Sequence, residues 1–437
     1  MAVFRGFQAL RPTPEKASCV ASLPYDVVSR EEAYALGKSN PDSFLHVERA
    51  EIDCPKEMDM YDEAVYRKAE ENLQKMIKEG TLVEDKKRCF YIYELIRKGK
   101  SQTGFVGCSS IDDYQNGVIR RHELTRTEKE KDRIRHMEVC CANTSPVFLT
   151  CRYTEKLLML LESFKQTHRP VYDFTAEDEI THRVWVVDEE EEIKIAEEEF
   201  GKIPSLYIAD GHHRAASAVK TGLKYREENP DYTGEEEFNY FLSVVFPCEQ
   251  LTILPYHRIV TDLNGITEKA FIGSLKFNFE LMLMPGFPCK PVEKHCMGMY
   301  TGGQWYHLKA WKDVYEKKDE ISQLDVSILQ DKVLRPVLGI EEPTTDKRLR
   351  FAGGNMKLRQ LQEMADETGG VAFVMFPVEM EDIMKIADEG KLMPPKSTWF
   401  EPKLRSGLFV HKLNKENKEN KKKRAVIPVE NLQRKTS

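Results

Sequence analysis

The chain has 437 residues, of which 41% are hydrophobic and 31% are charged, and its formal net charge is −7. This length suffices for two or three domains, and the mild acidity argues against a protein whose main partner is the nucleic-acid backbone. No apolar run approaches the roughly 18–20 residues that a membrane-spanning helix needs. Ten cysteines are scattered without a Cys-x-x-Cys pair or a secretory leader, so we expect reduced thiols and a cytoplasmic protein.

The first 55 residues predict short strands and one helix. Residues 3–12 predict a short strand that a proline ends. Ser29 is a credible N-cap of a helix with glutamates in its first turn. Asp26 lies just before this helix, where a carboxylate is either a turn-former or a placed base, and the local pattern favours the turn. Residues 40–49 predict a turn and then a strand that carries His46.

Helices and strands alternate along the rest of the chain. Strands are predicted at 89–96, 103–109, 181–187, 238–246, 251–260 and 371–377. Helices are predicted at 56–88, 126–143, 189–200, 268–277 and 380–390. The charge run at 126–135 is typical of a solvated helix face. Glu123 and His122 lie at a strand exit just before this run.

The most informative stretch is a strand–turn–helix pattern at 205–216. Residues 206–209 form a brief apolar run of strand length, and Asp210-Gly211 is a turn signal in which glycine permits close backbone approach. An alanine-rich helix follows from His212. Free backbone N–H groups and the positive end of the helix dipole make such a junction a ready site for phosphate.

The side chains at this junction leave more than one interpretation open. Arg214 adds a fork of charged donors, and His212 and His213 add imidazole donors, all suited to phosphate. Such junctions are common, however, and one glycine falls short of a phosphate-loop motif. A metal site with His257 is disfavoured, because adjacent helical histidines point in different directions and no second ligand pair stands at zinc spacing.

The end of the chain contains two further segments. A proline-rich loop at 393–400 carries Lys396 and two hydroxyl residues. Residues 413–437 form a Lys/Asn/Glu low-complexity segment, which predicts a disordered basic tail. Its basic run at 421–424 leaves a targeting or partner-binding role open, although most such tails are only solvated.

Six motifs carry a resemblance to a known family: Leu10-Arg11-Pro12, Pro24-Tyr25-Asp26-Val27-Val28-Ser29, Asn40-Pro41 through Ser43-Phe44-Leu45-His46-Val47, His122-Glu123, Asp210-Gly211-His212-His213-Arg214 and Lys396-Ser397-Thr398. In identity and order they resemble the bacterial and archaeal family called domain of unknown function 1015, from about residue 3 to about residue 412. Leu23 and Ala50 stand where the family pattern has proline, and the tail is extra, but none of these departures removes a polar site residue.

The Asp-Gly-His-His-Arg box is also similar to that of free serine kinases, which use a ParB/sulfiredoxin-like fold. The resemblance implies a phosphotransferase that uses ATP or ADP with Mg²⁺ and phosphorylates the hydroxyl of free L-serine or a similar small metabolite. In free serine kinases the catalytic base lies early in the chain, near the Leu-Arg-Pro strand. This resemblance makes Asp26 the leading candidate for the base in the present chain and Glu15 a weaker one. Mg²⁺ would be held by the phosphates with Asp210 or Glu123.

The candidate site residues fall into three sets. The catalytic candidates are Asp26, Glu123, His212 and His213. The candidates for binding the nucleotide phosphates are Asp210, Gly211, His212, His213 and Arg214. The candidates for binding the small-molecule substrate are His46, Arg49, Arg121 and Lys396. For His46 and His122 a structural role as partnered polar residues at strand ends is equally open.

The fold class implied by the resemblance is α+β. We expect a ParB/sulfiredoxin-like nucleotide-binding core from residues 1–55 and 179–263, interrupted by an inserted α/β segment at 56–178. A C-terminal α/β region at 264–412 precedes the tail. The alternative function is a non-catalytic, ParB-like nucleotide-binding switch or scaffold. The negative charge and the lack of a recognisable helix-turn-helix segment argue against its binding nucleic acid.

Overall fold

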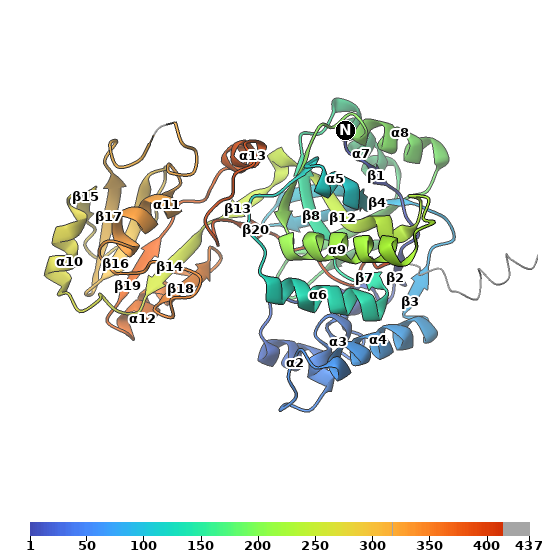
Figure 1. The fold of residues 1–437 in the computed structure, drawn as a ribbon, viewed down its shortest axis with the longest axis horizontal. Helices are drawn as coiled ribbons and strands as arrows, with labels where there is room; N and C mark the ends of the chain where they lie inside the picture. Colours follow the sequence, from blue (N-terminus) through green and yellow to red (C-terminus); the bar gives the residue numbers. More distant parts are fainter. Residues whose placement is uncertain (317, 414–437) are drawn as a thin grey trace, which may run out of the picture.

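The chain folds into two lobes, each built around its own β-sheet (Figure 1). The structure is a computed structural model and describes residues 1–316 and 318–413. The first lobe contains the N-terminal part of the chain and its last described stretch, and the second contains the yellow-to-orange part between them. Apart from Leu413, the predicted basic tail lies outside the described residues.

The first lobe is organised around a mixed sheet of nine strands. Eight of them lie in the order β6-β11-β8-β12-β5-β4-β10-β9, and β1 pairs with β5. β11 runs parallel to β6 and β12 parallel to β8, whereas the other pairs are antiparallel. The strands are β1 (Phe4–Arg5), β4 (Phe90–Arg97), β5 (Lys100–Ser110), β6 (Ile119–Arg120), β8 (Val147–Cys151), β9 (Tyr172–Thr175), β10 (Thr181–Val187), β11 (Leu206–Asp210) and β12 (Tyr240–Pro247). The protein is therefore of the predicted α+β class, with a large mixed sheet.

The central strands are apolar on both faces because both faces of the sheet are buried. In β4, Phe90 and Ile92 belong to one hydrophobic core, and Tyr91 and Tyr93 belong to the other. All four side chains are fully buried. This follows from the period of two that places successive strand residues on opposite faces. The antiparallel pairing of β4 with β5 confirms the two strands predicted there.

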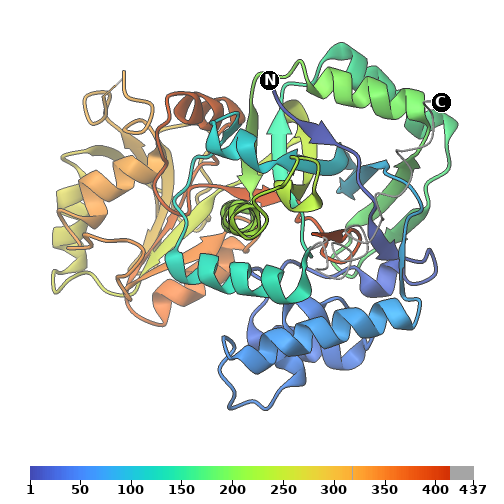
Figure 2. The same cartoon turned by 45° about the vertical axis from the view of Figure 1, so that its right-hand side comes forward.

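Helices cover the sheet in layers. Helix α9 packs on α6, and α6 packs on α4, which lies at the outer edge of the lobe (Figure 1). Figure 2 shows α9 almost end on above α6. The helices of this lobe are α1 (Ala17–Val20), α2 (Arg30–Ser39), α3 (Leu45–Glu48), α4 (Glu63–Lys78), α5 (Ile111–Gln115), α6 (Thr127–Cys140), α7 (Glu155–Thr167), α8 (Glu190–Phe200) and α9 (His212–Glu228), with short 3₁₀ turns η1 (Ala50–Asp53), η2 (Glu237–Asn239) and η3 (Cys248–Gln250).

The prediction that the charge run of α6 is solvated was wrong for part of the helix. Glu130, Asp132 and Arg133 are buried, because α6 lies between α9 and α4 rather than on the surface. The charges are paired: Arg133 Nε lies 2.9 Å from an oxygen of Asp132, and the Asp132 carboxylate also accepts from the Tyr66 hydroxyl at 3.0 Å.

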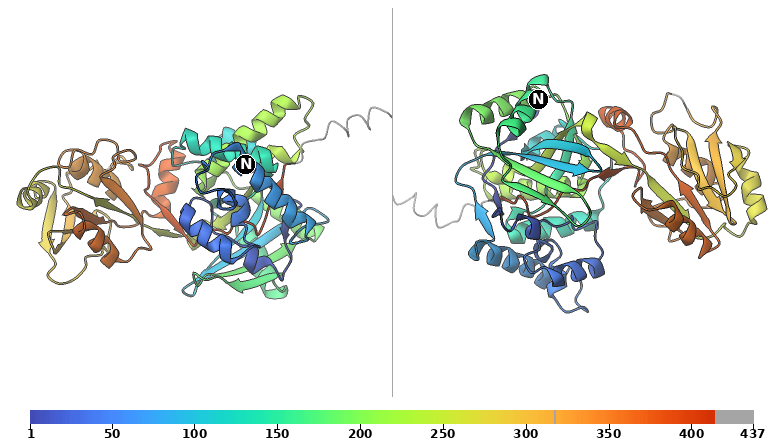
Figure 3. Two further views of the ribbon diagram at one scale, coloured as in Figure 1. Left: turned by 90° about the horizontal axis from the view of Figure 1, so that it is seen from below. Right: turned by 180° about the vertical axis from the view of Figure 1, so that it is seen from behind.

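The second lobe contains a six-stranded antiparallel sheet in the order β15-β17-β16-β19-β14-β18. Figure 3 shows this sheet from below and from behind, set apart from the first lobe. Its strands are β14 (Tyr256–Val260), β15 (Phe279–Leu283), β16 (Cys296–Thr301), β17 (Gln304–Ala310), β18 (Leu349–Gly353) and β19 (Val371–Val374). Its helices are α10 (Glu268–Leu275), α11 (Asp325–Leu329), the π-helix η4 (Gln330–Leu334), α12 (Leu358–Asp366) and α13 (Met380–Asp388).

The chain passes between the lobes twice; one short strand pair joins the two passages to each other, and another joins the end of the described chain to the first lobe. The outgoing β13 pairs with the returning β20, and the final β21 pairs with β7. The remaining pair is β2 with β3, near the N-terminus. These strands are β2 (Leu10–Pro12), β3 (Leu82–Glu84), β7 (Ala142–Asn143), β13 (Thr252–Leu254), β20 (Trp399–Glu401) and β21 (His411–Lys412).

Several predicted elements differ from the observed ones. His46 lies in the short helix α3 rather than in a strand: adjacent residues are buried together on both sides of it, and the Glu48 N–H donates to the Phe44 carbonyl at 3.0 Å as in a helical turn. The helix predicted at 56–88 is confined to α4, and Gly80 in the left-handed region begins the turn to β3. The helices predicted at 189–200 and 380–390 are confirmed as α8 and α13.

The large sheet extends across the expected boundaries of the core and the inserted segment. Strands from 1–55, 56–178 and 179–263 all hydrogen-bond into it. Within the described ranges, no helix is both long and apolar enough to cross a bilayer.

Candidate functional site

A cavity of about 570 Å³ lies where the two lobes meet, and we call it the central cavity. Its polar lining includes Asp26, Arg49, Glu123, His213 and Lys396. These side chains come from the loop before α2, from the end of α3, from the segments that open α6 and α9, and from the returning chain. The fold thus brings together residues that are far apart in the sequence.

The strand–turn–helix pattern predicted at this site is confirmed. β11 ends at Asp210, and α9 begins at His212. Gly211 between them has a φ of 92°, a left-handed conformation that favours glycine, and a Cβ there would lie 2.9 Å from Nε of Arg214. No side chain caps the orphan N–H groups of the first turn of α9, and His213 of that turn lines the central cavity.

Arg214 is buried beneath this turn rather than exposed in the central cavity. Its Nη1 donates to the carbonyl of Pro146 at 2.5 Å, and its Nη2 lies 3.8 Å from an oxygen of Asp210. Burial lowers the pKa of Arg214, but the carboxylates of Asp26 and Asp210 outweigh this effect and raise it overall. The charge of Asp26 therefore acts on the Arg214 guanidinium.

Asp210 is held ionised by cations on two sides. Its Oδ2 accepts a hydrogen bond from Lys403 at 3.0 Å, and its Oδ1 accepts from the N–H of Gly211 at 2.8 Å. Burial alone would raise the pKa of Asp210, but Lys403 and Arg214 hold it well below its usual range. Sequence reasoning missed Lys403, because nothing in the local pattern distinguishes it from other lysines.

His212 and His122 form a buried pair behind the turn. Their rings meet edge to face with centroids 4.5 Å apart, and His212 Nε2 accepts from the His122 backbone N–H at 3.4 Å. Burial lowers the pKa of His122 to about 4 and lowers that of His212 well below its ordinary value. Both rings are therefore neutral at pH 7, and neither lines the central cavity.

His213 is the histidine of the box that does line the cavity. Its Nε2 accepts from the backbone N–H of Arg126 at 2.9 Å, so in the neutral ring Nδ1 carries the hydrogen. Burial lowers the pKa of His213, and the carboxylate of Asp26 acts in the opposite direction. The Nδ1–H of the neutral His213 ring and the carboxylate of Asp26 thus both line the central cavity.

Glu123 and Lys396 both line the central cavity, and the charge of Lys396 acts on the Glu123 carboxylate. Burial raises the pKa of Glu123, and Lys396 opposes that rise. The Lys396 backbone is in the left-handed region at φ 58°, and its carbonyl accepts from Arg258 Nη2 at 3.0 Å. Arg258 of the second lobe therefore holds the loop that carries Lys396.

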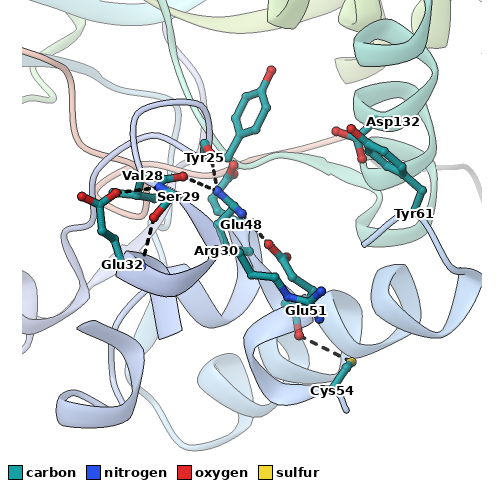
Figure 4. A network of polar contacts seen from close by, with 12 residues as sticks. Tyr25, Val28, Ser29, Arg30, Glu32, Glu48, Glu51, Cys54, Tyr61 and Asp132 are labelled. Carbon is teal, nitrogen blue, oxygen red and sulfur yellow. Dashed lines mark hydrogen bonds and ion pairs between the residues drawn. The ribbon is translucent and has the colours of Figure 1, made fainter. Parts of the chain in front are cut away.

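Arg49 fastens the loop that carries Asp26. Its Nη1 donates to the carbonyls of Tyr25, at 2.9 Å, and Val28, and its Nε donates to Glu51 at 2.6 Å. Figure 4 shows Tyr25, Val28 and Glu51 gathered around this network. Next to it, Ser29 and Glu32 form the predicted cap of α2: the Ser29 hydroxyl accepts from the Glu32 N–H, and the Glu32 carboxylate accepts from the Ser29 N–H.

Two predicted substrate residues are not brought to the central cavity. His46 lines a separate hollow, where Nδ1 lies 2.9 Å from Asp53 and Nε2 lies 3.2 Å from the Gly37 carbonyl. Arg121 is exposed, with its guanidinium 5.8 Å from the ring centroid of Tyr114. Glu15, the weaker candidate base, is exposed outside the cavity as well.

The described residues contain no group of three or more His, Cys, Asp or Glu side chains that could hold a metal ion. Magnesium usually takes only one or two protein carboxylates and relies on phosphates and water for its other ligands. Asp26, Glu123 and Glu342 are the carboxylates that line the central cavity.

The fold and site together define a two-lobed α+β protein with a polar strand–turn–helix junction at an interlobe cavity. The family model described as "Protein of unknown function (DUF1015)" matches residues 4–327, well over half of the chain. The chain belongs to this family, as its motifs predicted. No curated protein matches the chain.

Several solved structures are similar to this chain, all at low identity and low TM-score. A free serine kinase in complex with AMP is 13% identical, with 73% of this chain and 92% of that chain covered and a TM-score of 0.36. SbnI with a C-terminal truncation, from Staphylococcus aureus, is 12% identical, with 73% and 93% covered and a TM-score of 0.37. A conserved hypothetical protein from Pyrococcus furiosus is 13% identical, with 72% and 94% covered and a TM-score of 0.34. Likeness at this level does not establish a shared activity.

Proposed function

We propose that the protein is a nucleotide-dependent kinase that phosphorylates the hydroxyl of free L-serine or a similar small hydroxylated metabolite. The donor is ATP or ADP, used with Mg²⁺, and the first lobe is a ParB/sulfiredoxin-like nucleotide-binding core. The observation that carries the proposal is the meeting of Asp26 with the uncapped start of α9 at one cavity. An acidic group and an anion-binding helix end are the two parts that phosphoryl transfer to an alcohol requires.

The phosphate side of the proposed site is the turn at Gly211 and the first turn of α9. The backbone can approach a phosphate closely at Gly211, because this residue has no side chain. Arg214 lies directly beneath the turn and adds positive charge without occupying the cavity. Asp210, neutralised by Lys403, fixes the turn rather than repelling the phosphates.

The acceptor side is formed by Asp26 and His213. Asp26 accepts the proton of the attacking hydroxyl or orients that hydroxyl, while His213 donates from Nδ1 to an oxygen of the transferred group. A bond forms between the acceptor oxygen and the terminal phosphorus, the bond from that phosphorus to the bridging oxygen breaks, and the shortened nucleotide leaves. Lys396, across the cavity, adds a cation to the same volume.

The cavity fits such ligands in size and in charge. Its volume of about 570 Å³ lies within the range of roughly 300–1,000 Å³ that is usual for small-molecule sites. When bound, Mg²⁺ would neutralise phosphate charge, with Glu123 as its protein ligand; Asp210, the other candidate, does not line the central cavity. His213 and Lys396 would meet the remaining anionic oxygens.

A non-catalytic nucleotide switch is the second candidate, favoured by one observation. Glu342 and Thr344 of the second lobe line the same cavity as His213 of the first. A nucleotide bound there would bridge the lobes and could fix their arrangement without any transfer.

The test is a screen of small hydroxylated metabolites against ATP and ADP with Mg²⁺, read by mass spectrometry. The kinase proposal predicts a phosphorylated product, O-phosphoserine, from L-serine. Measurable nucleotide binding without a product from any of the hydroxylated compounds would contradict the kinase and support the switch.

A further inference from the structure

A second, smaller pocket opens beside the central cavity, and we call it the side pocket. The two share Tyr25, Arg49, Met60 and Lys129 in their linings. The side pocket has a volume of about 40 Å³. A single water needs roughly 10–15 Å³, so the side pocket holds a group of a few heavy atoms and not a nucleotide.

The wall of the side pocket is rich in buried charge with an acidic excess. It carries the carboxylates of Glu48, Glu51 and Asp132 and the guanidiniums of Arg49 and Arg133. All five residues are buried. Figure 4 shows the three acidic residues, two on the segment that follows α2 and one on α6.

Two other residues that can carry positive charge line the side pocket. His136 does not cancel the acidic excess, because burial lowers its pKa and keeps the ring neutral at pH 7. Lys129, on the wall shared with the central cavity, places its ammonium 5.8 Å from the ring centroid of Tyr61. The same ammonium donates to the hydroxyl of Tyr61 at 3.3 Å, and Tyr61 lines neither pocket.

One carboxylate oxygen in this wall has no partner. Glu51 is paired with Arg49 at 2.6 Å, and Asp132 is paired with Arg133 at 2.9 Å. Glu48 has one oxygen 3.4 Å from Arg133, but its Oε1 has no hydrogen-bond partner among the described residues. The Glu48 side chain is only 1% exposed, so bulk water does not satisfy this oxygen. An unsatisfied buried charge is costly, and a cationic ligand would remove that cost.

An ammonium group fits the side pocket better than a metal ion does. Within residues 1–316 and 318–413, no three metal-ligating side chains converge. A primary ammonium has three donors, fits the volume and forms short charge-assisted hydrogen bonds to carboxylates. The side pocket also borders Tyr25, the neighbour of Asp26, so a small molecule can present an amine to one pocket and a hydroxyl to the other.

We propose that the side pocket receives the protonated amino group of the phosphoryl acceptor, with Glu48 as its carboxylate partner. This inference rests on the proposed kinase and narrows its substrate class. The acceptor is an amino alcohol, a class that includes the hydroxy amino acids, and not a sugar, a polyol or a hydroxy acid. Glu48 is then a specificity-determining residue of the site.

The test compares two acceptors that differ only at the amine. Glycerate has a hydroxyl where L-serine has its ammonium, and binding of each is measured by calorimetry with a non-hydrolysable ATP analogue present. We expect L-serine to bind at least about 30-fold more tightly than glycerate, as is typical of a buried charge pair. Equal binding of the two would overturn the proposal, and this comparison needs no variant to fold.

Glu48→Gln should remove the preference for L-serine, because the amide keeps the shape of the side chain but loses its charge. Glu94→Gln is the matched control: Glu94 is equally buried and ion-paired, but it lies in β4 and lines neither pocket. Persistence of the preference in Glu48→Gln would overturn the role of Glu48.

Phosphoryl transfer, followed in parallel, separates the two proposals. Binding of L-serine through Glu48 without a phosphorylated product would support the amino pocket and contradict the kinase. Phosphorylation of glycerate but not of L-serine would support the kinase and overturn the amino pocket.

Discussion

The ammonium of Lys403 donates a 3.0 Å hydrogen bond to Oδ2 of Asp210, 193 residues earlier in the chain. The other oxygen of the same carboxylate accepts from the N–H of Gly211 at 2.8 Å. The returning chain is therefore tied to the turn that opens α9. The candidate phosphate site thus depends on the last part of the chain that the structure describes.

Replacing Lys403 should destabilise the protein by leaving Asp210 without its nearest cation. Lys403→Met should lower the free energy of unfolding by about 1–3 kcal/mol, measured by urea denaturation. Lys391→Met is the control, because Lys391 pairs with acidic residues at the surface of the second lobe and such pairs contribute about 0–1 kcal/mol. Equal losses in the two variants would contradict the buried role of Lys403.

Gly211→Ala should cost more than an ordinary replacement of a left-handed glycine. The backbone conformation alone costs about 1–2 kcal/mol, and the new Cβ would also press on Arg214, which is held by the Pro146 carbonyl. Gly390→Ala supplies the comparison, since Gly390 has a φ of 67° but no atom within 4 Å of the added Cβ. Thermal unfolding should show the larger loss for Gly211→Ala, and a loss no greater than that of Gly390→Ala would be incompatible with this packing.

The buried pair of His122 and His212 predicts a loss of stability in weak acid. Burial lowers the pKa of His122 to about 4 from an ordinary value of 6.5. Between these pH values the unfolded chain binds a proton that the folded chain does not, so the free energy of unfolding falls as the pH falls. His122→Gln should reduce that slope by up to about 1.4 kcal/mol per pH unit, measured by denaturation at several pH values.

His46 provides a control, because its effect on the pH dependence of stability is opposite in sign to that of His122. The hydrogen bond that His46 donates to the Asp53 carboxylate raises the pKa of His46, so its contribution to stability is present in weak acid and is lost as the pH rises through the raised value. His46→Gln should therefore lower stability mainly below pH 6.5. If His122→Gln and His46→Gln changed the pH dependence in the same direction, the assignment of a neutral His122 would be wrong.

Asp26→Asn tests the proposed base separately from nucleotide binding. The amide cannot accept the hydroxyl proton, so turnover should fall by a factor of about 10²–10⁴. Nucleotide affinity should change little, because the phosphates are assigned to the start of α9. Asp188→Asn is the control, because Asp188 pairs with Lys87 at the surface and lies outside the central cavity. Near-normal turnover of Asp26→Asn would rule out Asp26 as the base.

Much of the local structure followed from patterns within a few residues. The cap of α2 was predicted from Ser29 and the glutamate three positions later, and the turn at Gly211 from an apolar run before a helix. These features depend on neighbours in the sequence, so the sequence alone predicts them. The family followed from the same short motifs.

Features set by distant neighbours could not be predicted in this way. The burial of Asp132 and Arg133 depends on the packing of α6 between two other helices, and the contact between Asp210 and Lys403 joins residues that are 193 positions apart. Glu48 stood in no predicted site, because its unsatisfied oxygen is apparent only when the charges around it are paired in three dimensions.

The central claim is most directly tested by incubating the protein with ATP or ADP, Mg²⁺ and L-serine and analysing the products by mass spectrometry. The account predicts O-phosphoserine, formed by the wild type and by Asp188→Asn and suppressed in Asp26→Asn. Nucleotide binding without any O-phosphoserine, or a product that forms equally well in Asp26→Asn, would contradict it.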